Sequence, residues 1–467
     1  MRGAGFVLAA PTLRAAAGQL EASLARAATG ATVRRYVSRP DLRPPVLTVL
    51  QRRHGSSPGY VFVAPTSGPG QPGAMIAEDA GNVVWFHPVV HKVVTDFKVQ
   101  RLHGEPVLTW WEGKSVHGLS DGEWVVVDAA YGELARFSTA RGLRGDLHEF
   151  QITPWNTAFV TSKEVRRWDL RPVGGGPHGH VVGGVVQELA LPSGRLLWEW
   201  HSLDHVAVSE TEITAKPGPR FDYFHLNSIQ VAPDGHLIVS ARNTWAAYKI
   251  DRHTGRVLWR LGGKRSDFEL GRGVRFEWQH DVREHANGVI SVFDNAAAPQ
   301  EEPQSRALLL RLDTRRKRAS LLHAYTHRPP VIARYLGNTQ LLANGNVFVG
   351  WGGSPFMTEF DHAGDVIFDA RLPHGAESYR AFRFPWTGRP AGRPAAVVRG
   401  RTLHASWNGA TAVASWQLRE NGRPTRTMRR TGFETALPLT TSAARAEVVA
   451  LDASGAPLGT SASLRID

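Results

Sequence analysis

The sequence predicts an all-β protein: a six-bladed β-propeller followed by a small immunoglobulin- or fibronectin-like β-sandwich. Three observations lead to this fold class: a repeated strand motif, a repeated turn-and-strand motif, and a change of texture after Pro385. Short strands and tight turns in units of about 40 to 50 residues are typical of propeller blades. We expect the propeller over residues 45–388 and the sandwich over residues 389–467.

The first repeat is clearest in NSIQVAPDGHLIVSARN, which starts at Asn227. A glutamine is followed by four residues, a glycine and an apolar strand. The strand half alone appears once more as GYVFVAP, starting at Gly59. Together the copies number six and indicate six blades. The glutamine-equivalent positions are Gln100, Gln151, Gln230, Arg283 and Gln340.

The second repeat is a polar turn with glycine, followed by a strand that ends near an aromatic residue. It appears as EDAGNVVWFH, LPSGRLLWEWH, DRHTGRVLWRLG and, with Phe368 as its aromatic, DHAGDVIFDAR. A turn of this composition before alternating apolar residues is typical of β-hairpins. Each repeat therefore holds several short strands and shows little helical periodicity.

The two ends of the chain differ from the repeats. After the linker PWTGRPAGRPA, the segments HASWNG and ASWQLRENG indicate two strands of a sandwich around a buried tryptophan. Residues 1–44 are expected to form an Ala/Arg-rich leader. Its apolar run GFVLAA is short and is followed by Pro11 and Arg14, so it makes a poor secretory signal.

Composition excludes several classes of function. The 467 residues carry a net charge of +13 and include no cysteine, which excludes disulfides, thiolate metal sites and cysteine nucleophiles. The basic residues are scattered rather than clustered with aromatic residues, so no nucleic-acid partner is expected. No apolar stretch reaches roughly 18 residues, so no membrane span is expected either.

Polar residues recur at one position of the first repeat. His148, Asn227 and His280 each lie three residues before the glutamine-equivalent position, and Asn338, beside Thr339, lies one residue off. Because one strand of each blade lines the central channel of a propeller, these side chains are expected to converge on the axis. His225 precedes Asn227 by two residues and can join this ring. Arg242 closes the same repeat, and the sequence leaves open at which end of its strand it emerges.

A ring of this kind has two main uses. Neutral imidazoles bind metals, or they act as nucleophiles and acid–base groups on an anion. Arg242 and Asn227 favour the anion, since a guanidinium repels a cation, and we expect no metal ligand and no cofactor. Two alternatives stay open: a non-catalytic propeller that binds anionic or sulfated ligands, and a metal- or quinone-dependent propeller oxidoreductase.

The motifs TWWEG, DLHEFQIT, FHLNSI and QHD together resemble the arylsulfotransferase (ASST) family in its actinobacterial and fungal branch, over most of residues 45–388. The resemblance implies sulfuryl transfer from an aryl sulfate to a phenolic acceptor, both small molecules, through a sulfated histidine and without phosphoadenosine phosphosulfate. It also favours an extracytoplasmic or secreted location.

The resemblance further implies roles for single residues. His280 of QHD would be the nucleophile, and His148 of DLHEF the general acid and base. The residues that hold the sulfuryl oxygens would be His225, Asn227 and Arg242. The residues expected to contact the substrate are Asn338, Thr339 and Trp110 of TWWEG.

Overall fold

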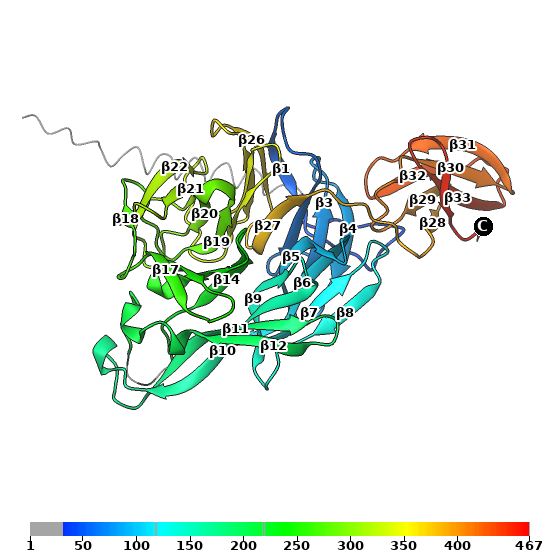
Figure 1. The fold of residues 1–467 in the computed structure, drawn as a ribbon. Helices are drawn as coiled ribbons and strands as arrows, with labels where there is room; N and C mark the ends of the chain where they lie inside the picture. Colours follow the sequence, from blue (N-terminus) through cyan, green and yellow to red (C-terminus); the bar gives the residue numbers. More distant parts are fainter. Residues whose placement is uncertain (1–30, 117–118, 217, 219, 467) are drawn as a thin grey trace, which may run out of the picture.

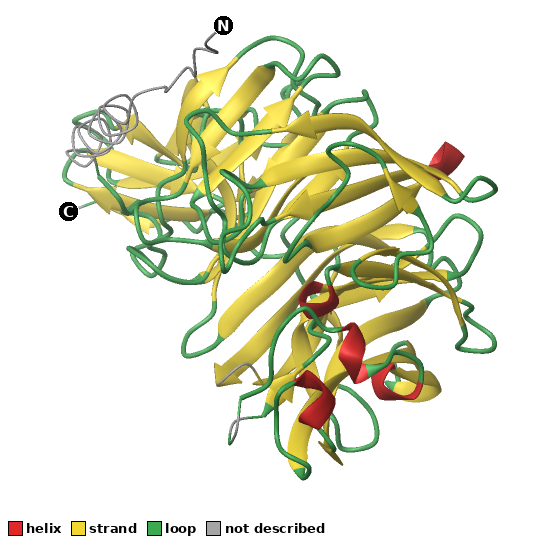
Figure 2. Cartoon of the chain, turned by 90° about the vertical axis from the view of Figure 1, so that its left-hand side faces the viewer, coloured by secondary structure: helices red, strands yellow, loops and turns green. Residues whose placement is uncertain are grey.

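The computed structural model describes residues 31–116, 119–216, 218 and 220–466, and this part of the chain is all-β (Figure 1). The helical segments within it are short 3₁₀ turns, seen between the strands in Figure 2. They are η1 (Arg171–Val173), η2 (Ser202–Asp204), η3 (Val208–Glu210), η4 (Arg242–Thr244) and η5 (Ala286–Gly288). Among these described residues, no helix has the length and apolar character needed to cross a membrane.

The first half of the chain forms consecutive antiparallel units of four strands. The first unit contains β2 (Tyr60–Pro65), β3 (Gly73–Ala77), β4 (Val83–Pro88) and, from the far end of the chain, β27 (Ser378–Phe384). The second contains β5 (Val93–Leu102), β6 (Glu105–Val116), β7 (Leu119–Val127) and β8 (Glu133–Phe137). The third contains β9 (Arg144–Ile152), β10 (Thr157–Trp168), β11 (Gly179–Ala190) and β12 (Arg195–His201).

The second half continues the pattern. The next unit contains β14 (Leu226–Val231), β15 (Leu237–Ala241), β16 (Ala246–Ile250) and β17 (Val257–Gly262). It is followed by β19 (His280–His285), β20 (Val289–Asp294), β21 (Arg306–Asp313) and β22 (Arg318–Tyr325), and then by β23 (Asn338–Leu341), β24 (Val347–Gly350), β25 (Phe356–Phe360) and β26 (Val366–Arg371). Three short strands extend these units: β1 (Thr48–Arg52) pairs with β26, β13 (Phe221–Asp222) with β11, and β18 (Glu269–Leu270) with β22.

The first strands of the units close into a propeller-like ring. Strands β5, β9, β14, β19, β23 and β27 contact one another in this order, and β27 contacts β5. The ring closes because β27 follows the last unit in the chain but pairs with β2 of the first. The two ends of the ring-forming segment are also held together by the pairing of β1 with β26.

Glycines in left-handed conformation form the hairpin turns that the first repeat predicts. Gly235, Gly288 and Gly345 have φ of 83°, 67° and 87°, at the turns that connect β14 with β15, β19 with β20, and β23 with β24. Glycine adopts this conformation without the steric cost of a Cβ. The apolar strand after each glycine is therefore reversed onto the strand before it.

The repeated glutamines join neighbouring units. The side-chain amide of Gln230 donates to the backbone oxygen of Glu284 at 2.9 Å and accepts from the Glu284 amide at 2.6 Å. Gln340 makes the same pair of bonds with Arg383, at 2.9 and 2.8 Å. Between the ring-forming strands of neighbouring units, such a pair of hydrogen bonds takes the place of the backbone pair that joins adjacent strands of a β-sheet. Gln100 bonds in this way to Phe150 and Ile152, and Gln151 accepts from the Val231 amide.

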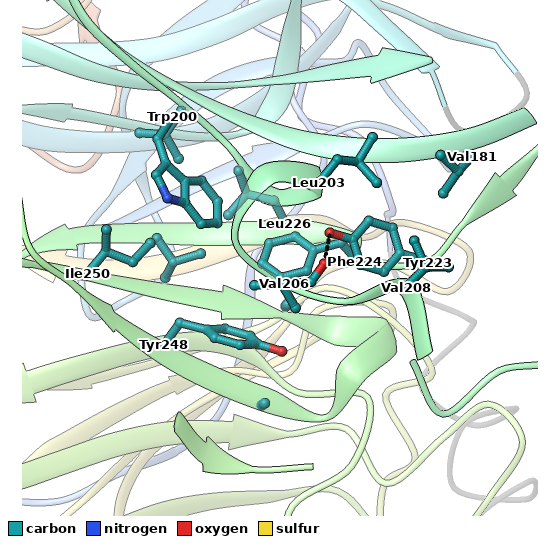
Figure 3. Close-up of a cluster of buried hydrophobic side chains, with 14 of the residues drawn as sticks. Val181, Trp200, Leu203, Val206, Val208, Tyr223, Phe224, Leu226, Tyr248 and Ile250 are labelled. Atoms are coloured by element: carbon teal, nitrogen blue, oxygen red, sulfur yellow. Dashed lines mark hydrogen bonds between the residues drawn. The ribbon is translucent and has the colours of Figure 1, made fainter. Parts of the chain in front are cut away.

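Hydrophobic clusters fill the spaces between units, and one of them positions part of the site (Figure 3). Trp200, Phe224 and Tyr248 are buried together between the third and fourth units. Tyr223 donates its hydroxyl to the Val206 oxygen at 3.1 Å, the dashed line of Figure 3. The segment that leads into β14 is therefore anchored by two buried aromatic residues directly before His225.

The C-terminal residues form two further sheets to one side of the ring (Figure 1). Trp416 is buried in the core between them, as the sequence predicts for this region. One sheet contains β28 (Ala395–Arg399), β29 (Thr402–Ser406) and β32 (Glu434–Pro438). The other contains β31 (Arg423–Arg429), β30 (Ser415–Glu420), β33 (Arg445–Leu451), β34 (Pro457–Thr460) and β35 (Leu464–Arg465).

The segment expected as a leader is described only from residue 31; residues 1–30 of that expectation lie outside the described part. Residues 31–44 pack against the C-terminal sheets. The rings of Tyr36 and Phe433 are 4.2 Å apart, and the Ser38 hydroxyl lies 2.7 Å from that of Ser406. This described piece is thus part of the folded structure.

Candidate functional site

Three histidines from three different units meet at the end of the ring where the first strands begin. His148 lies in β9, His225 directly before β14, and His280 is the first residue of β19. The rings of His148 and His225 are 5.1 Å apart in an edge-to-face arrangement. Both histidines lie close enough to His280 to lower its pKa when they are protonated. The structure therefore brings together imidazoles that are up to 132 positions apart in the sequence.

Asp146 holds His148. The Nδ1 of His148 lies 2.5 Å from Oδ2 of Asp146, and both side chains are buried. Burial alone would raise the pKa of Asp146, but the positive charges of His148 and Lys163 hold it below its ordinary value. The ionised carboxylate accepts the Nδ1 proton, so Nε2 of His148 is left as the nitrogen that can exchange a proton with a ligand.

His225 is held in the same way, with a strained backbone. Its φ is 54°, and Asp222 accepts from both the His225 amide and its Nδ1, each at 2.9 Å. A histidine in the left-handed region costs about 1 kcal/mol or more, a cost commonly found at functional sites. Burial and then the charge of Lys163 lower the pKa of His225 to about 4, against the raising effect of Asp222.

Asn295 determines the tautomer of His280. Its Nδ2 donates to the backbone oxygens of Ala333 at 2.7 Å and Leu336 at 2.9 Å. Its Oδ1 must then face His280, whose Nδ1 lies 2.7 Å away and donates the proton. Burial and next the charge of Arg242 lower the pKa of His280 well below its ordinary value. His280 is thus a neutral imidazole with a lone pair on Nε2.

Arg242 directly follows β15 and lies at the same end of the β14–β15 pair as His225. The sequence had left open at which end it emerges. Its backbone amide donates to the His225 oxygen at 3.0 Å. Its guanidinium lies 4.7 Å from the ring centre of Trp278 and donates to Oδ1 of Asn243 at 3.0 Å. Burial lowers the pKa of Arg242 to about 10, with Asp222 acting in the opposite direction, so the group stays cationic at neutral pH.

Asn227 lies between the histidines and β27. Its Nδ2 donates to the Gln279 oxygen at 2.7 Å, and its Oδ1 is buried without a hydrogen-bond partner among the described residues. Its backbone oxygen accepts from the Tyr379 hydroxyl at 3.2 Å and from Arg380 at 3.1 Å. The second Nδ2 hydrogen and the Oδ1 lone pairs are available to a ligand.

A buried ionic network lies next to the histidines. Glu149, which follows His148 in β9, contacts Lys98 and Arg283 at 2.5 Å each and Arg380 at 3.0 Å. Arg380 also contacts Asp96 at 2.7 Å and Asp281 at 3.5 Å. Three carboxylates therefore balance three cations. These six residues lie on four of the ring-forming strands, β5, β9, β19 and β27. The members are Asp96, Lys98, Glu149, Asp281, Arg283 and Arg380.

Asn338 and Thr339 are buried at the start of β23, and the Asn338 side chain bonds to the backbone. Asn338 donates to the Ala381 oxygen at 2.8 Å and accepts from its amide at 2.9 Å, the same kind of link that the glutamines make. The Thr339 amide donates to Asp281 at 3.1 Å. Thr339 also lines a cavity of about 350 Å³ together with Gln100, Gln151 and Gln230.

The structure does not place Trp110 among the histidines. Its ring packs with Trp85 and Phe97 in the hydrophobic cluster between the first two units, and its Nε1 donates to Glu112 at 3.1 Å. Its indole is buried among apolar neighbours of β6 and the adjoining strands. These contacts are those of a core residue.

Sequence reasoning missed the partners of the histidines. Asp146 and Asp222 precede His148 and His225 by two and three residues, and such close spacing could have drawn attention to them. Lys163, whose Nζ lies 3.2 Å from Asp222, comes from β10, and Asn295 directly follows β20. Nothing in the local sequence around Lys163 or Asn295 indicates these contacts.

In the described part of the chain, no group of three or more His, Asp or Glu residues is placed to hold a metal ion.

Comparisons with known proteins agree with the sequence motifs. Residues 98–372, more than half of the chain, match the family model of arylsulfotransferase (ASST). No curated protein sequence matches the chain.

Distant structural likenesses also exist. A Bacteroides caccae protein of unknown function shares 13% identity with a TM-score of 0.44, covering 70% of this chain and 98% of that one. An inactive virginiamycin B lyase from Staphylococcus aureus, solved with quinupristin, shares 8% identity with a TM-score of 0.33, covering 81% and 97%. These scores are too low to say more about this chain.

Proposed function

The chain belongs to the arylsulfotransferase family, and on this premise we propose that it transfers a sulfuryl group from a phenolic sulfate ester to a phenolic acceptor. The transfer proceeds through a sulfated histidine and needs no phosphoadenosine phosphosulfate. The observation that carries the proposal is the meeting of three anchored imidazoles beside the Arg242 guanidinium. Such a site suits a tetrahedral oxyanion whose leaving group needs a proton.

In the first half-reaction, the Nε2 lone pair of His280 attacks the sulfur. The N–S bond forms while the S–O bond to the phenol breaks, and the phenolate takes a proton from Nε2 of His148. In the second half-reaction, the acceptor phenol returns a proton to His148, and its oxygen attacks the sulfur as the N–S bond breaks. One site serves both phenols in turn, as a covalent intermediate allows.

Arg242, Asn227 and His225 hold the sulfuryl oxygens. The guanidinium supplies a fixed cation stabilised against Trp278, and Asn227 supplies an N–H. His225 is neutral in the free protein, with its Nδ1 proton directed to Asp222. It becomes a donor at Nε2 only as an imidazolium, and the negative charge of a bound sulfate ester favours that form.

The test uses the purified protein and 4-nitrophenyl sulfate without acceptor. We expect the intact mass to rise by one SO₃ group, and the adduct to disappear when a phenol is added. His280→Ala should abolish the adduct. His285→Ala is the matched control, because His285 lies at the other end of β19 and contacts Ser291 at 2.9 Å. A full adduct in His280→Ala would overturn the assignment of the nucleophile.

The same experiment separates the alternatives. A propeller that only binds anionic or sulfated ligands would retain aryl sulfate without an adduct or nitrophenol release. A metal- or quinone-dependent oxidoreductase would oxidise a substrate and would form no sulfated protein.

The proposal also includes the finer description of the fold. We infer that the ring is a six-bladed propeller over residues 45–388, supported by the closed contacts of six first strands. We infer an immunoglobulin-like sandwich over residues 389–467, supported by its two sheets and the buried Trp416.

A further inference from the structure

A cavity of about 350 Å³ is surrounded by the ring itself, and we call it the axial cavity. All six ring-forming strands contribute to its wall, through Gln100 of β5, Gln151 of β9, Gln230 of β14, Arg283 of β19, Gln340 of β23 and Phe382 of β27. It lies toward the end of the ring opposite the histidines, because Gln151 is three residues beyond His148 in β9, about 10 Å of extended strand. Lys98 and Arg283 of its wall contact Glu149, so the buried ionic network separates it from the histidine site.

The glutamines of this wall have N–H groups to spare, whereas their side-chain oxygens are engaged. Each oxygen accepts from a backbone amide of the next ring-forming strand: Gln100 from Ile152, Gln151 from Val231, Gln230 from Glu284 and Gln340 from Arg383. A primary amide carries two N–H donors, of which Gln230 and Gln340 each use one in these links. Nε2 of Gln151 donates to no group in the described part of the chain. The wall therefore offers these N–H groups to a ligand.

The uncompensated charge of the wall is Arg101. Asp281, Lys98 and Arg283 belong to the ionic network, in which carboxylates and cations balance. Burial and next the charge of Arg283 lower the pKa of His285, so this residue adds no charge at neutral pH. Arg101 is exposed, and no carboxylate pairs with it among the residues that the structure describes. A ligand that neutralises this guanidinium carries a single negative charge.

The remaining wall is apolar and leaves room for more than an ion. Its apolar side chains are Val99, Ile152, Leu341 and Phe382. The volume lies at the lower end of the range of about 300–1,000 Å³ that small-molecule sites occupy. Apolar surface of this kind accommodates the carbon atoms of an organic molecule, whereas an inorganic anion would leave it without a partner.

We propose that the axial cavity is a second binding site, which takes a small organic carboxylate. The carboxylate lies at the Arg101 guanidinium and the N–H groups of Gln151, and the carbon atoms lie against the apolar wall. Arg101 follows Gln100, whose amide bonds to the two residues on either side of Gln151, so both polar groups belong to the same part of the wall. The site is separate from the histidines and does not depend on sulfuryl transfer.

Calorimetric titration with benzoate, without any sulfate donor, tests the proposal, and benzamide serves as the uncharged probe of the same shape. Gln151→Glu keeps the oxygen that the Val231 amide uses but replaces the N–H groups by a negative charge, and we expect benzoate binding to weaken at least roughly tenfold. Arg101→Gln should weaken it about fivefold. The matched control is Gln417→Glu in β30, where the oxygen accepts from Arg419 at 3.3 Å and the binding should not change. Circular dichroism checks that each variant is folded.

A further variant, Arg242→Gln, distinguishes the axial cavity from the histidine site. Benzoate binding that survives in Arg242→Gln and is lost in Gln151→Glu would support the proposal. Binding that is lost in Arg242→Gln and retained in Gln151→Glu would place benzoate at the histidines and overturn it. Equal affinity for benzoate and benzamide, or no benzoate binding to the unmodified chain, would also overturn it.

Discussion

Asn295 determines the tautomer of His280, the proposed nucleophile. Two backbone carbonyls fix the orientation of its amide, and the amide in turn fixes the proton of His280 on Nδ1. A nucleophilic imidazole needs a lone pair at the attacking nitrogen and must stay uncharged. Asn295 supplies the first condition, while burial and Arg242 supply the second. We therefore regard Asn295 as a positioning residue.

Replacing Asn295 tests this role through pH dependence. Asn295→Asp places a carboxylate against Nδ1, which favours the imidazolium and raises the pKa of His280. Below that raised pKa the nucleophile is protonated, so the acid limb of adduct formation should move to higher pH. Asn295→Ala removes the tautomer control, and we expect the rate to fall about 10- to 100-fold at neutral pH. The measurement is the rate of 4-nitrophenol release between pH 5 and 9.

Asn344→Asp provides the control for this comparison. Asn344 is exposed in the hairpin turn between β23 and β24, so its replacement adds the same charge away from His280. A pH profile for Asn295→Asp that coincides with the wild-type profile would show that Asn295 does not control the nucleophile.

At the scale of the strand, β9 carries two neighbouring residues with different tasks. His148 joins the histidine site, while Glu149 joins the ionic network with cations from β5, β19 and β27. Successive residues of a strand point to opposite sides, so adjacent positions can serve chemistry and cohesion separately. The network links the ring-forming strands β5, β9, β19 and β27 at fixed distances beside the site.

Glu149→Gln should destabilise the protein strongly. The change leaves the Lys98, Arg283 and Arg380 charges with one carboxylate fewer in a largely buried environment. Breaking a buried network in this way costs about 3–5 kcal/mol. Glu133→Gln is the control, because Glu133 is paired with Arg136 at the surface, where such pairs contribute about 0–1 kcal/mol. Urea denaturation measures both, and equal midpoints for the two variants would contradict the role of the network.

At the scale of the whole molecule, the ring and the C-terminal sheets are joined outside the histidine site. Tyr131 donates its hydroxyl to the Gly409 oxygen at 2.8 Å, and Asn408 exchanges two hydrogen bonds with the backbone of Phe86. None of the contacts described for the histidines involves residues 389–467. We therefore expect the C-terminal sheets to support the ring from its side rather than to contribute to the chemistry.

Two truncations separate these contributions. A chain that ends at residue 388 keeps β27 and should fold and form the sulfated adduct at a rate within about threefold of the full chain. A chain that ends at residue 376 lacks Tyr379, Arg380 and the strand that closes the ring, and we expect it not to fold. Circular dichroism and intact-mass measurement check both. Loss of the adduct in the longer truncation, with its fold intact, would assign the C-terminal sheets a direct part in catalysis.

Sequence patterns alone predicted the strands, their turns and the proximity of the three histidines, because each pattern lies within a short stretch of chain. The turn at Gly235 needs a left-handed glycine, and the strand after it needs apolar alternation, so both are encoded within a few residues. The recurrence of His148, Asn227 and His280 at one position of the repeat indicated that they would converge. The repeated glutamines were visible too, although their function as links between units was not.

The tertiary structure alone decided which groups serve these residues. Asn295 reaches His280 across a strand pair, and Glu149 meets Arg283 and Arg380, which lie 134 and 231 positions away along the chain. Trp110, which we expected at the substrate from the sequence, packs in the hydrophobic cluster between two units. Such contacts depend on how the ring closes, because closure sets the angle and the distance between segments that are far apart in the sequence. No local sequence pattern encodes that angle or that distance.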